Sequence, residues 1–346
     1  MTNRVRFIAV GIIVLSVSAI GIRAALLHQD RVVSDTITRQ APELGQHAHL
    51  LLPNLDGAVM VVADRPHDPF EVVAEDRFER LTRLRTFTVS TNSHGLRSPE
   101  IGVKQGTRIL CVGDSVTFGW GVPYGETYPA LLAEKLGVEV INAGVPAMKP
   151  ASIARWVELN AAELEPDLVL FARRPDWSSP DAWGDYQRSV RAVAAAVSPA
   201  KVGVMLPPVS TFDPMGVANM AEEQRRAEQL IRPHPLLDLT LAFRAALPLP
   251  GVILEIEDGI QRMVKLPERT VLLEATAPRG GPGQATLADA VVEAFESDDD
   301  IIEPLFFDGG HPDAAGFVLF TDAVAAWIEA EGLLRAAPRG GGGPPR

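Results

Sequence analysis

The chain has 346 residues, which is enough for one large domain with appendages or for two modest domains. Hydrophobic residues make up 47% of it and charged residues 22%, a composition that is typical of folded globular proteins and argues against an intrinsically disordered chain. The formal net charge of −12 argues against nucleic acid or an anionic lipid surface as a partner.

The cysteine and histidine content argues against disulfides and metal. Cys111 is the single cysteine, so no disulfide forms within one chain, and its apolar neighbours favour a small buried side chain. No spacing of cysteine and histidine resembles a zinc site. The sequence therefore predicts neither a bound metal nor a cofactor.

Residues 1–27 are predicted to be a signal anchor or a signal peptide. Arg4 and Arg6 precede an uncharged stretch over residues 7–22. Its length lies between a membrane span of roughly 20 residues and a signal core of about 7 to 15. We expect an uncleaved anchor, with a removed signal peptide as the alternative, because no clean Ala-x-Ala site follows. The arginines would stay inside, so the remainder is predicted to face the periplasm or the cell exterior, held at the inner membrane.

Residues 28–85 are predicted to be an N-terminal embellishment of the main domain, which covers residues 86–335. Proline- and glycine-containing turns interrupt short apolar runs in this first part. Residues 86–90 alternate like a strand, and residues 91–95 indicate a turn.

From residue 106 onward, short apolar runs alternate with helical patterns. The predicted strands cover 109–112, 138–141, 168–172 and 202–206, and the predicted helices cover 125–136, 150–164 and 181–198. This alternation is typical of an α/β fold with a mainly parallel sheet covered on both faces.

The pattern is looser over residues 212–300. Strands at 251–256 and 270–274 and a helix at 285–295 are predicted there, and a last amphipathic helix covers 314–333. Residues 336–346 are rich in glycine and proline and are predicted to be a disordered tail.

Ser115 is the candidate nucleophile. The sequence Gly113-Asp114-Ser115 follows a predicted strand, so the serine lies at the carboxyl edge of the sheet, where open α/β folds place their sites. Backbone N–H groups at such a turn can stabilise an oxyanion. The alternative is a serine that only caps a helix. Because position 117 is threonine, the turn is not the Gly-x-Ser-x-Gly elbow of α/β-hydrolases.

His311 and Asp308 supply the other half of the candidate site, just before the last helix. An aspartate three residues before the histidine can reach its Nδ1, which frees Nε2 to take a proton from serine. Ser115, Asp308 and His311 thus stand in the order Ser…Asp…His of a serine-nucleophile acyl hydrolase.

These residues resemble blocks I, II and V of the GDSL/SGNH hydrolase superfamily over about residues 86–333. The matching segments are Gly113-Asp114-Ser115, Asn142-Ala143-Gly144 and Asp308-x-x-His311. The stretch 91–97, followed by 108–122, is similar to exported or membrane-anchored bacterial members.

The resemblance implies a three-layer flavodoxin-like α/β/α sandwich. It also implies that Ser115 is the nucleophile, that His311 is the base and that Asp308 orients it. The backbone N–H groups of Ser115 and Gly144 would be the oxyanion donors.

One block departs from the family pattern. Block III carries Gly-x-Asn-Asp, and its asparagine side chain donates to the oxyanion. Here Asp176 matches the aspartate but Pro175 replaces the asparagine, and proline offers no donor. Losing one such donor typically costs about 100- to 1000-fold in rate. Arg173 or Arg174 either donates to the oxyanion in place of the missing asparagine or holds an anionic group of the substrate. The alternative is that both arginines are solvated charges in a loop.

The sequence therefore predicts an exported serine esterase that acts on O-acyl esters through an acyl-enzyme. Its partner would be a small-molecule or carbohydrate ester, with acylated carbohydrate as one candidate, and the N-terminal segment would contact the membrane. Two alternatives stay open: an O-acyltransferase on envelope polysaccharide, and a catalytically impaired binding or assembly protein with the same fold.

Overall fold

The computed structural model describes most of the predicted main domain and part of the segment before it. The described residues are 37–64, 83–176, 179–208, 224–246, 252–257, 260–265, 272–276, 305–306 and 310–334. The predicted signal segment 1–27, the predicted helix 285–295, the tail 336–346 and Asp308 lie outside them.

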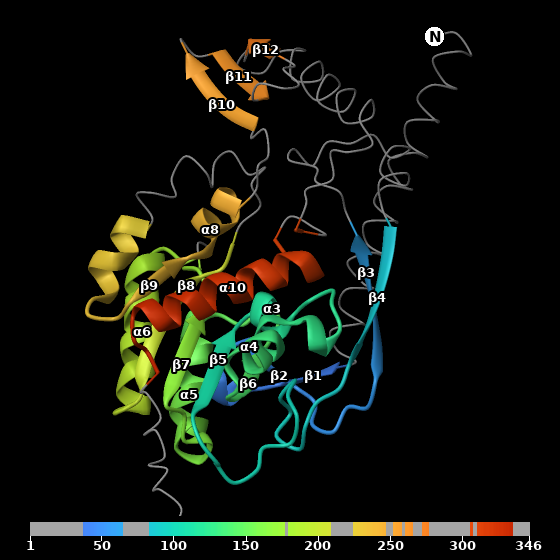
Figure 1. Cartoon of the computed structure of the whole chain (residues 1–346), viewed down its shortest axis with the longest axis vertical. Helices are drawn as coiled ribbons and strands as arrows, with labels where there is room; N and C mark the ends of the chain where they lie inside the picture. The colour runs from blue at the N-terminus through green and yellow to red at the C-terminus, as the bar shows by residue number, and fades with distance from the viewer. Residues whose placement is uncertain are drawn as a thin grey trace, which may run out of the picture.

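A five-stranded parallel sheet forms the centre of the molecule, in the order β6-β5-β7-β8-β9 (Figure 1). The strands are β5 (Arg108–Gly113), β6 (Glu139–Gly144), β7 (Leu168–Ala172), β8 (Lys201–Leu206) and β9 (Leu236–Asp238). The predicted α/β class and parallel sheet are confirmed, as are the four longer strands. The three-residue β9 was not predicted.

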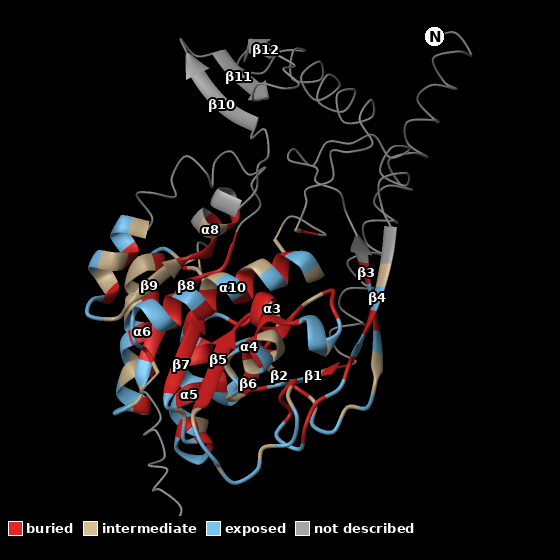
Figure 2. Ribbon diagram, viewed as in Figure 1, coloured by how far each residue is buried: buried red, intermediate tan, exposed pale blue. Residues whose placement is uncertain are grey.

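The sheet is buried on both faces, and β5 shows why its sequence is almost continuously apolar. Ile109 and Cys111 face one core cluster, while Leu110 and Val112 face the other, because successive side chains of a strand point to opposite sides. Figure 2 shows the central strands as buried along most of their length.

Helices cover both faces of the sheet and complete a three-layer arrangement. One layer contains α4 (Tyr128–Leu136), α8 (Leu239–Ala246) and α10 (Ala314–Ala330), whose buried residues share a cluster. The other contains α5 (Pro150–Leu164) and α6 (Ala182–Val197). The helices predicted at 150–164 and 181–198 match α5 and α6 closely, whereas α8 was not predicted.

The N-terminal part packs on the α5 side of the sheet. The short strands β1 (Thr38–Gln40) and β2 (His49–Leu51) are antiparallel and are joined through a 3₁₀ turn, Pro42–Leu44. A second pair, β3 (Ala58–Asp64) with β4 (Arg83–Val89), crosses residue 85, the predicted limit of the embellishment. Leu44, Leu51 and Phe87 bury their side chains in the same cluster as α5.

A separate antiparallel sheet consists of β10 (Val252–Glu257), β11 (Ile260–Lys265) and β12 (Leu272–Thr276). Its outer strands lie within two residues of the predicted ones, and β11 was not predicted. Among the described residues, no helix combines the length and the apolar character needed to cross a membrane.

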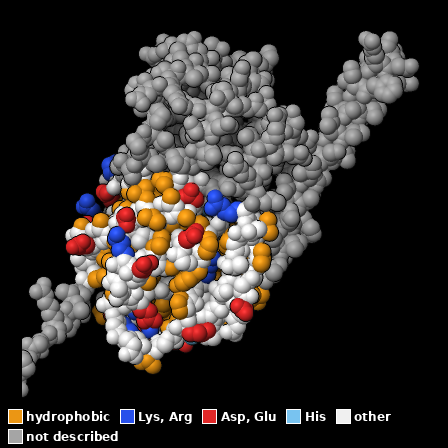
Figure 3. All heavy atoms as spheres, turned by 45° about the vertical axis from the view of Figure 1, so that its right-hand side comes forward, with side chains coloured by type: hydrophobic (Ala, Val, Ile, Leu, Met, Phe, Trp, Pro, Cys, Tyr) orange, Lys and Arg blue, Asp and Glu red, His pale blue; other side chains and the backbone are white. Residues whose placement is uncertain are grey.

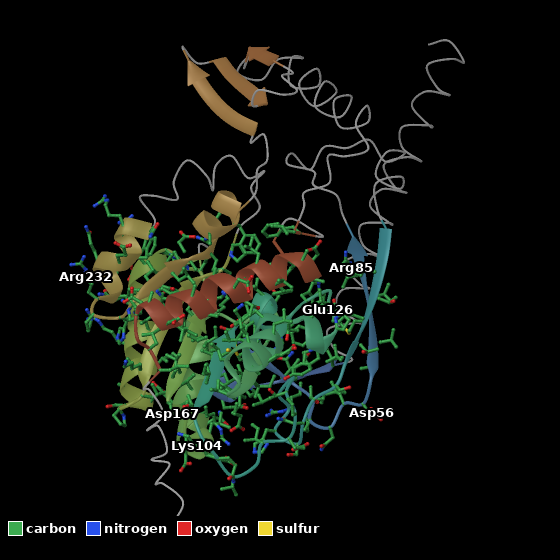
Figure 4. The ribbon with its side chains drawn as sticks, in the orientation of Figure 1. Asp56, Arg85, Lys104, Glu126, Asp167 and Arg232 are labelled. Atoms are coloured by element: carbon green, nitrogen blue, oxygen red, sulfur yellow. The ribbon has the colours of Figure 1, made fainter. Side chains whose placement is uncertain are left out.

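Ion pairs hold the amino-terminal edge of the central sheet. Arg108 is buried and donates through Nε and Nη2 to the carboxylate of Glu139, at 2.7 and 3.0 Å. Lys104 pairs with Asp167 at 2.8 Å, and both labels lie at this end of the sheet in Figure 4. A two-point arginine–carboxylate pair fixes orientation as well as distance. The opposite, carboxyl edge carries the candidate site.

Cys111 is fully buried in β5, and burial raises the pKa of its thiol to about 12. Because only the thiolate reacts with alkylating reagents, about one thiol in 10⁴ is reactive at pH 8. We expect iodoacetamide to label the protein stoichiometrically only after unfolding in guanidinium, as measured by intact mass. Labelling of the folded protein at the rate of a free thiol would contradict the burial of Cys111.

Candidate active site

Ser115 begins a short helix, α3 (Ser115–Phe118), that lies directly on the carboxyl edge of the sheet. Gly113 and Gly144 end adjacent strands in register, and neither has room for a Cβ atom. A Cβ at Gly113 would lie 2.4 Å from the carbonyl oxygen of Ala172, and one at Gly144 would lie 2.2 Å from the nitrogen of Phe118. Glycine at both strand ends therefore lets α3 approach the sheet closely.

Asp114 fixes the turn before the serine. Its Oδ1 accepts from the N–H of Val116 at 3.1 Å, which caps α3, and its Oδ2 pairs with Nη1 of Arg173 at 3.0 Å. Within the described part of the chain, the N–H of Ser115 itself makes no hydrogen bond. It stands at the first position of α3, where no helical partner exists.

Arg97 holds the other end of α3 and is fully buried. Its guanidinium donates to the carbonyl oxygens of Phe118, Gly119 and Val122, each at 2.8 Å, and to that of Thr88 at 3.1 Å. It thereby satisfies carbonyl groups that the end of a helix leaves unpaired. Burial lowers the pKa of Arg97 to about 10. No role was assigned to Arg97 from the sequence; the available signal was an arginine two residues after the 91–95 turn.

His311 comes from the far end of the chain and meets the serine. Its Nε2 lies 2.8 Å from Oγ of Ser115, although the two residues are 196 positions apart. The segment is fixed by Asp313, whose side chain caps α10 by accepting from the N–H of Gly316 at 2.8 Å, and whose own N–H donates to Leu305. The ring of Trp120 lies beside that of His311, with centroids 6.3 Å apart.

Two of the three residues predicted to form a triad are thus brought together, and Asp308 lies outside the described residues. A histidine and a serine hydroxyl within hydrogen-bonding distance are the nucleophile–base pair of acyl transfer. The arrangement can activate a hydroxyl.

Gly144 differs from the sequence-based expectation that its N–H is an oxyanion donor. In the structure this N–H donates to Oδ1 of Asn142 at 3.0 Å. Asn142 is fully buried, so its amide must find partners locally, and the N–H two residues later is one of them. Its Nδ2 donates to the carbonyl of Phe118 at 3.4 Å. Asn142 therefore links the end of β6 to α3, and the Gly144 N–H is already engaged.

The two arginines after β7 have separate places. Arg173 donates from Nε to the carbonyl of Met148 at 3.0 Å and pairs with Asp114, next to the serine. Arg174 points toward β8 and β9, where it donates to the carbonyl of Pro207 at 2.7 Å and to Oγ1 of Thr240 at 2.6 Å. The alternative of two solvated loop charges is wrong, because both side chains are largely buried and bonded.

The remaining residues of this loop do not offer a side-chain amide. Pro175 is buried, and Asp176 pairs with Lys149 at 3.0 Å. Of the two arginines, Arg173 is therefore the one that lies beside the turn carrying Ser115.

The strand order places these residues at a topological switch point. The chain moves from β5 outward to β6 and then returns to β7 on the other side of β5, so the connections leave the sheet in opposite directions. Open α/β sheets bind ligands at this point, outside the carboxyl ends of the strands. Ser115 follows β5 and Arg173 follows β7, which puts both at the crevice.

On the face shown in Figure 3, acidic and basic side chains are interspersed among apolar ones. The described residues contain no group of three or more histidine, cysteine, aspartate or glutamate side chains placed to hold a metal ion.

No family model matches the sequence, and no curated protein matches it. Several solved structures do resemble it. A lipolytic protein of the G-D-S-L family from Desulfitobacterium hafniense is 15% identical, with a TM-score of 0.41 over 64% of this chain and 99% of that one. A catalytic mutant of Axe2, an acetylxylan esterase from Geobacillus stearothermophilus, is 16% identical, with a TM-score of 0.39 over 68% and 100%.

A lipase/acylhydrolase from Enterococcus faecalis is 15% identical, with a TM-score of 0.39 over 65% of this chain and 97% of that one. Because the identities and TM-scores are this low, what those proteins act on is not transferred to this chain. The three similar structures cover between 64% and 68% of this chain.

Proposed function

We propose that the chain is a serine-nucleophile hydrolase of O-acyl esters. The observation that carries the proposal is the 2.8 Å contact between Nε2 of His311 and Oγ of Ser115. With Nε2 unprotonated, His311 takes the hydroxyl proton while Oγ attacks the ester carbonyl carbon. Collapse of the tetrahedral intermediate breaks the bond to the alcohol, which leaves with the proton from His311. Water then attacks the acyl-enzyme, again with His311 as base, and releases the acid.

The negative charge that develops on the carbonyl oxygen needs donors. The N–H of Ser115 makes no hydrogen bond among the described residues, and the guanidinium of Arg173 is held nearby through Asp114. Fixed donors in a site of low dielectric constant are the largest single source of stabilisation in such reactions. Asp308 would orient His311 through Nδ1.

The substrate class is proposed as O-acyl esters of small molecules or carbohydrates. The protein is further proposed to act outside the cytoplasm, on the basis of the charge and apolar pattern of residues 1–27.

The test is the release of p-nitrophenol from p-nitrophenyl acetate by the purified chain, with Ser115→Ala as the blank. A parallel reaction contains an acetyl acceptor, for instance a short xylo-oligosaccharide, and is followed by mass spectrometry. Free acetate as the product supports a hydrolase, whereas acetylated sugar supports the transferase alternative. Equal rates for the chain and the blank would refute both and favour a binding protein.

Arg173→Gln is expected to lower kcat/KM for the same ester by about 10- to 100-fold. This loss is smaller than the loss expected for an unpaired oxyanion donor, because the positive charge of Arg173 is partly neutralised by the carboxylate of Asp114. Arg174→Gln is the matched control and is expected to leave kcat/KM within about twofold, because its contacts lie toward β8 and β9. Steady-state kinetics on both variants measures the difference. Equal losses in the two would contradict a role for Arg173 at the reacting centre.

A further inference from the structure

The loop between β6 and α5, residues 144–148, has one backbone N–H without a partner in the described part of the chain. Gly144 donates to Asn142, Val145 to the carbonyl of Gly113 at 3.2 Å, and Met148 to that of Val145 at 3.1 Å. Pro146 has no N–H to donate. The remaining amide belongs to Ala147, which is exposed.

This loop lies against the nucleophile turn. The hydrogen bond from Val145 reaches Gly113, two residues before Ser115. Arg173 bridges the other end, because it donates to the carbonyl of Met148 and pairs with Asp114. Ala147 stands between these two anchor points, in a loop that is tied at both ends to the serine turn.

Ala147 has a φ of 59°, in the left-handed region that residues other than glycine seldom adopt. Such a conformation persists only where surrounding contacts hold it. The hydrogen bond from the Met148 N–H to the carbonyl of Val145, at 3.1 Å, closes the turn around Ala147. His49 adds a contact to the central peptide of this turn, because its Nε2 lies 2.9 Å from the carbonyl oxygen of Pro146. A carbonyl oxygen only accepts, so Nε2 carries the hydrogen and donates.

The carbonyl of Pro146 and the N–H of Ala147 belong to one peptide unit. That unit is trans, so its C=O and N–H point in opposite directions. Holding the carbonyl toward His49 therefore turns the N–H to the opposite side. His49 comes from β2, in the N-terminal embellishment, 97 residues earlier in the sequence.

We propose that His49 is a positioning residue of the active site: it fixes the Pro146–Ala147 peptide so that the N–H of Ala147 donates to the substrate oxyanion together with that of Ser115. This inference rests on the proposed esterase function. The N–H of Ala147 would serve as the oxyanion donor of this loop, because the N–H of Gly144 already donates to Asn142. The β1–β2 hairpin, which carries His49, would then help to position the active site.

The experiment compares His49→Ala, His49→Gln and His49→Leu in the full chain, with His94→Ala as the control at a histidine on the surface. For p-nitrophenyl acetate, His49→Ala and His49→Leu are expected to lower kcat at least about 10-fold with KM within about twofold, since an oxyanion donor acts on the transition state. His49→Gln retains a donor and is expected to recover most of the rate. Thermal unfolding shows which variants fold; His49→Leu fills the volume and serves if His49→Ala does not.

A wild-type kcat in folded His49→Leu or His49→Ala overturns the inference and leaves the esterase function standing. So does a His49→Gln rate as low as that of His49→Leu, because the effect would then come from packing. An inactive wild-type chain, unlabelled at Ser115 by a fluorophosphonate, overturns the function and the inference together.

Discussion

Ser115→Ala is expected to lower kcat for p-nitrophenyl acetate by about 10⁴-fold or more, to the level given by binding and oxyanion donors alone. The substitution removes the oxygen that lies 2.8 Å from Nε2 of His311, and no acyl-enzyme can then form. Steady-state release of p-nitrophenol measures the loss.

The control is Ser93→Ala, at an exposed serine that bonds to Glu100 at the surface. It is expected to keep the wild-type rate. A loss below tenfold in Ser115→Ala, with unfolding unchanged, would show that another group attacks the ester.

His311→Ala is expected to cause a loss of the same order, because the hydroxyl of Ser115 is a weak nucleophile without a base. The two residues act as a unit, so the double variant Ser115→Ala/His311→Ala is expected to be no slower than either single variant. The three rate constants are measured against the uncatalysed reaction. A double variant slowed by the product of the two single effects would mean that Ser115 and His311 contribute independently, contrary to the contact between them.

The fold was largely predictable because its central strands are buried on both faces. The apolar runs at β5, β7 and β8 stand out in the sequence, and the helices between them show a regular apolar period. The three-residue β9 and the eight-residue α8 escaped prediction because they are short and lie in a stretch without regular alternation. The hydrogen bonds that define β9 come from β8, more than 25 positions away.

The candidate site was predictable where a motif fixes backbone position. Ser115 is placed by the end of β5 and His311 by the start of α10, and both positions follow from local pattern. The engagement of the Gly144 N–H depends on the side-chain conformation of Asn142, which no local pattern specifies.

The separation of Arg173 from Arg174 could not be read from the sequence either. These hydrogen-bond acceptors lie 25 to 66 positions away, on the loop before α5, directly after β8, on β9 and on α8. Adjacent residues in an extended segment point to opposite sides, so one arginine faces Asp114 and the other faces Thr240. The role of Asp308 stays a prediction.

The most direct test of the central claim is covalent labelling with diisopropyl fluorophosphate, followed by peptide mass mapping. An activated serine attacks the phosphorus and displaces fluoride, so the wild-type chain is expected to carry one adduct, on Ser115. The adduct should be absent in Ser115→Ala and should form far more slowly in His311→Ala. An unlabelled Ser115 in the folded wild-type chain, or equal labelling rates with and without His311, would contradict a nucleophile activated by that histidine.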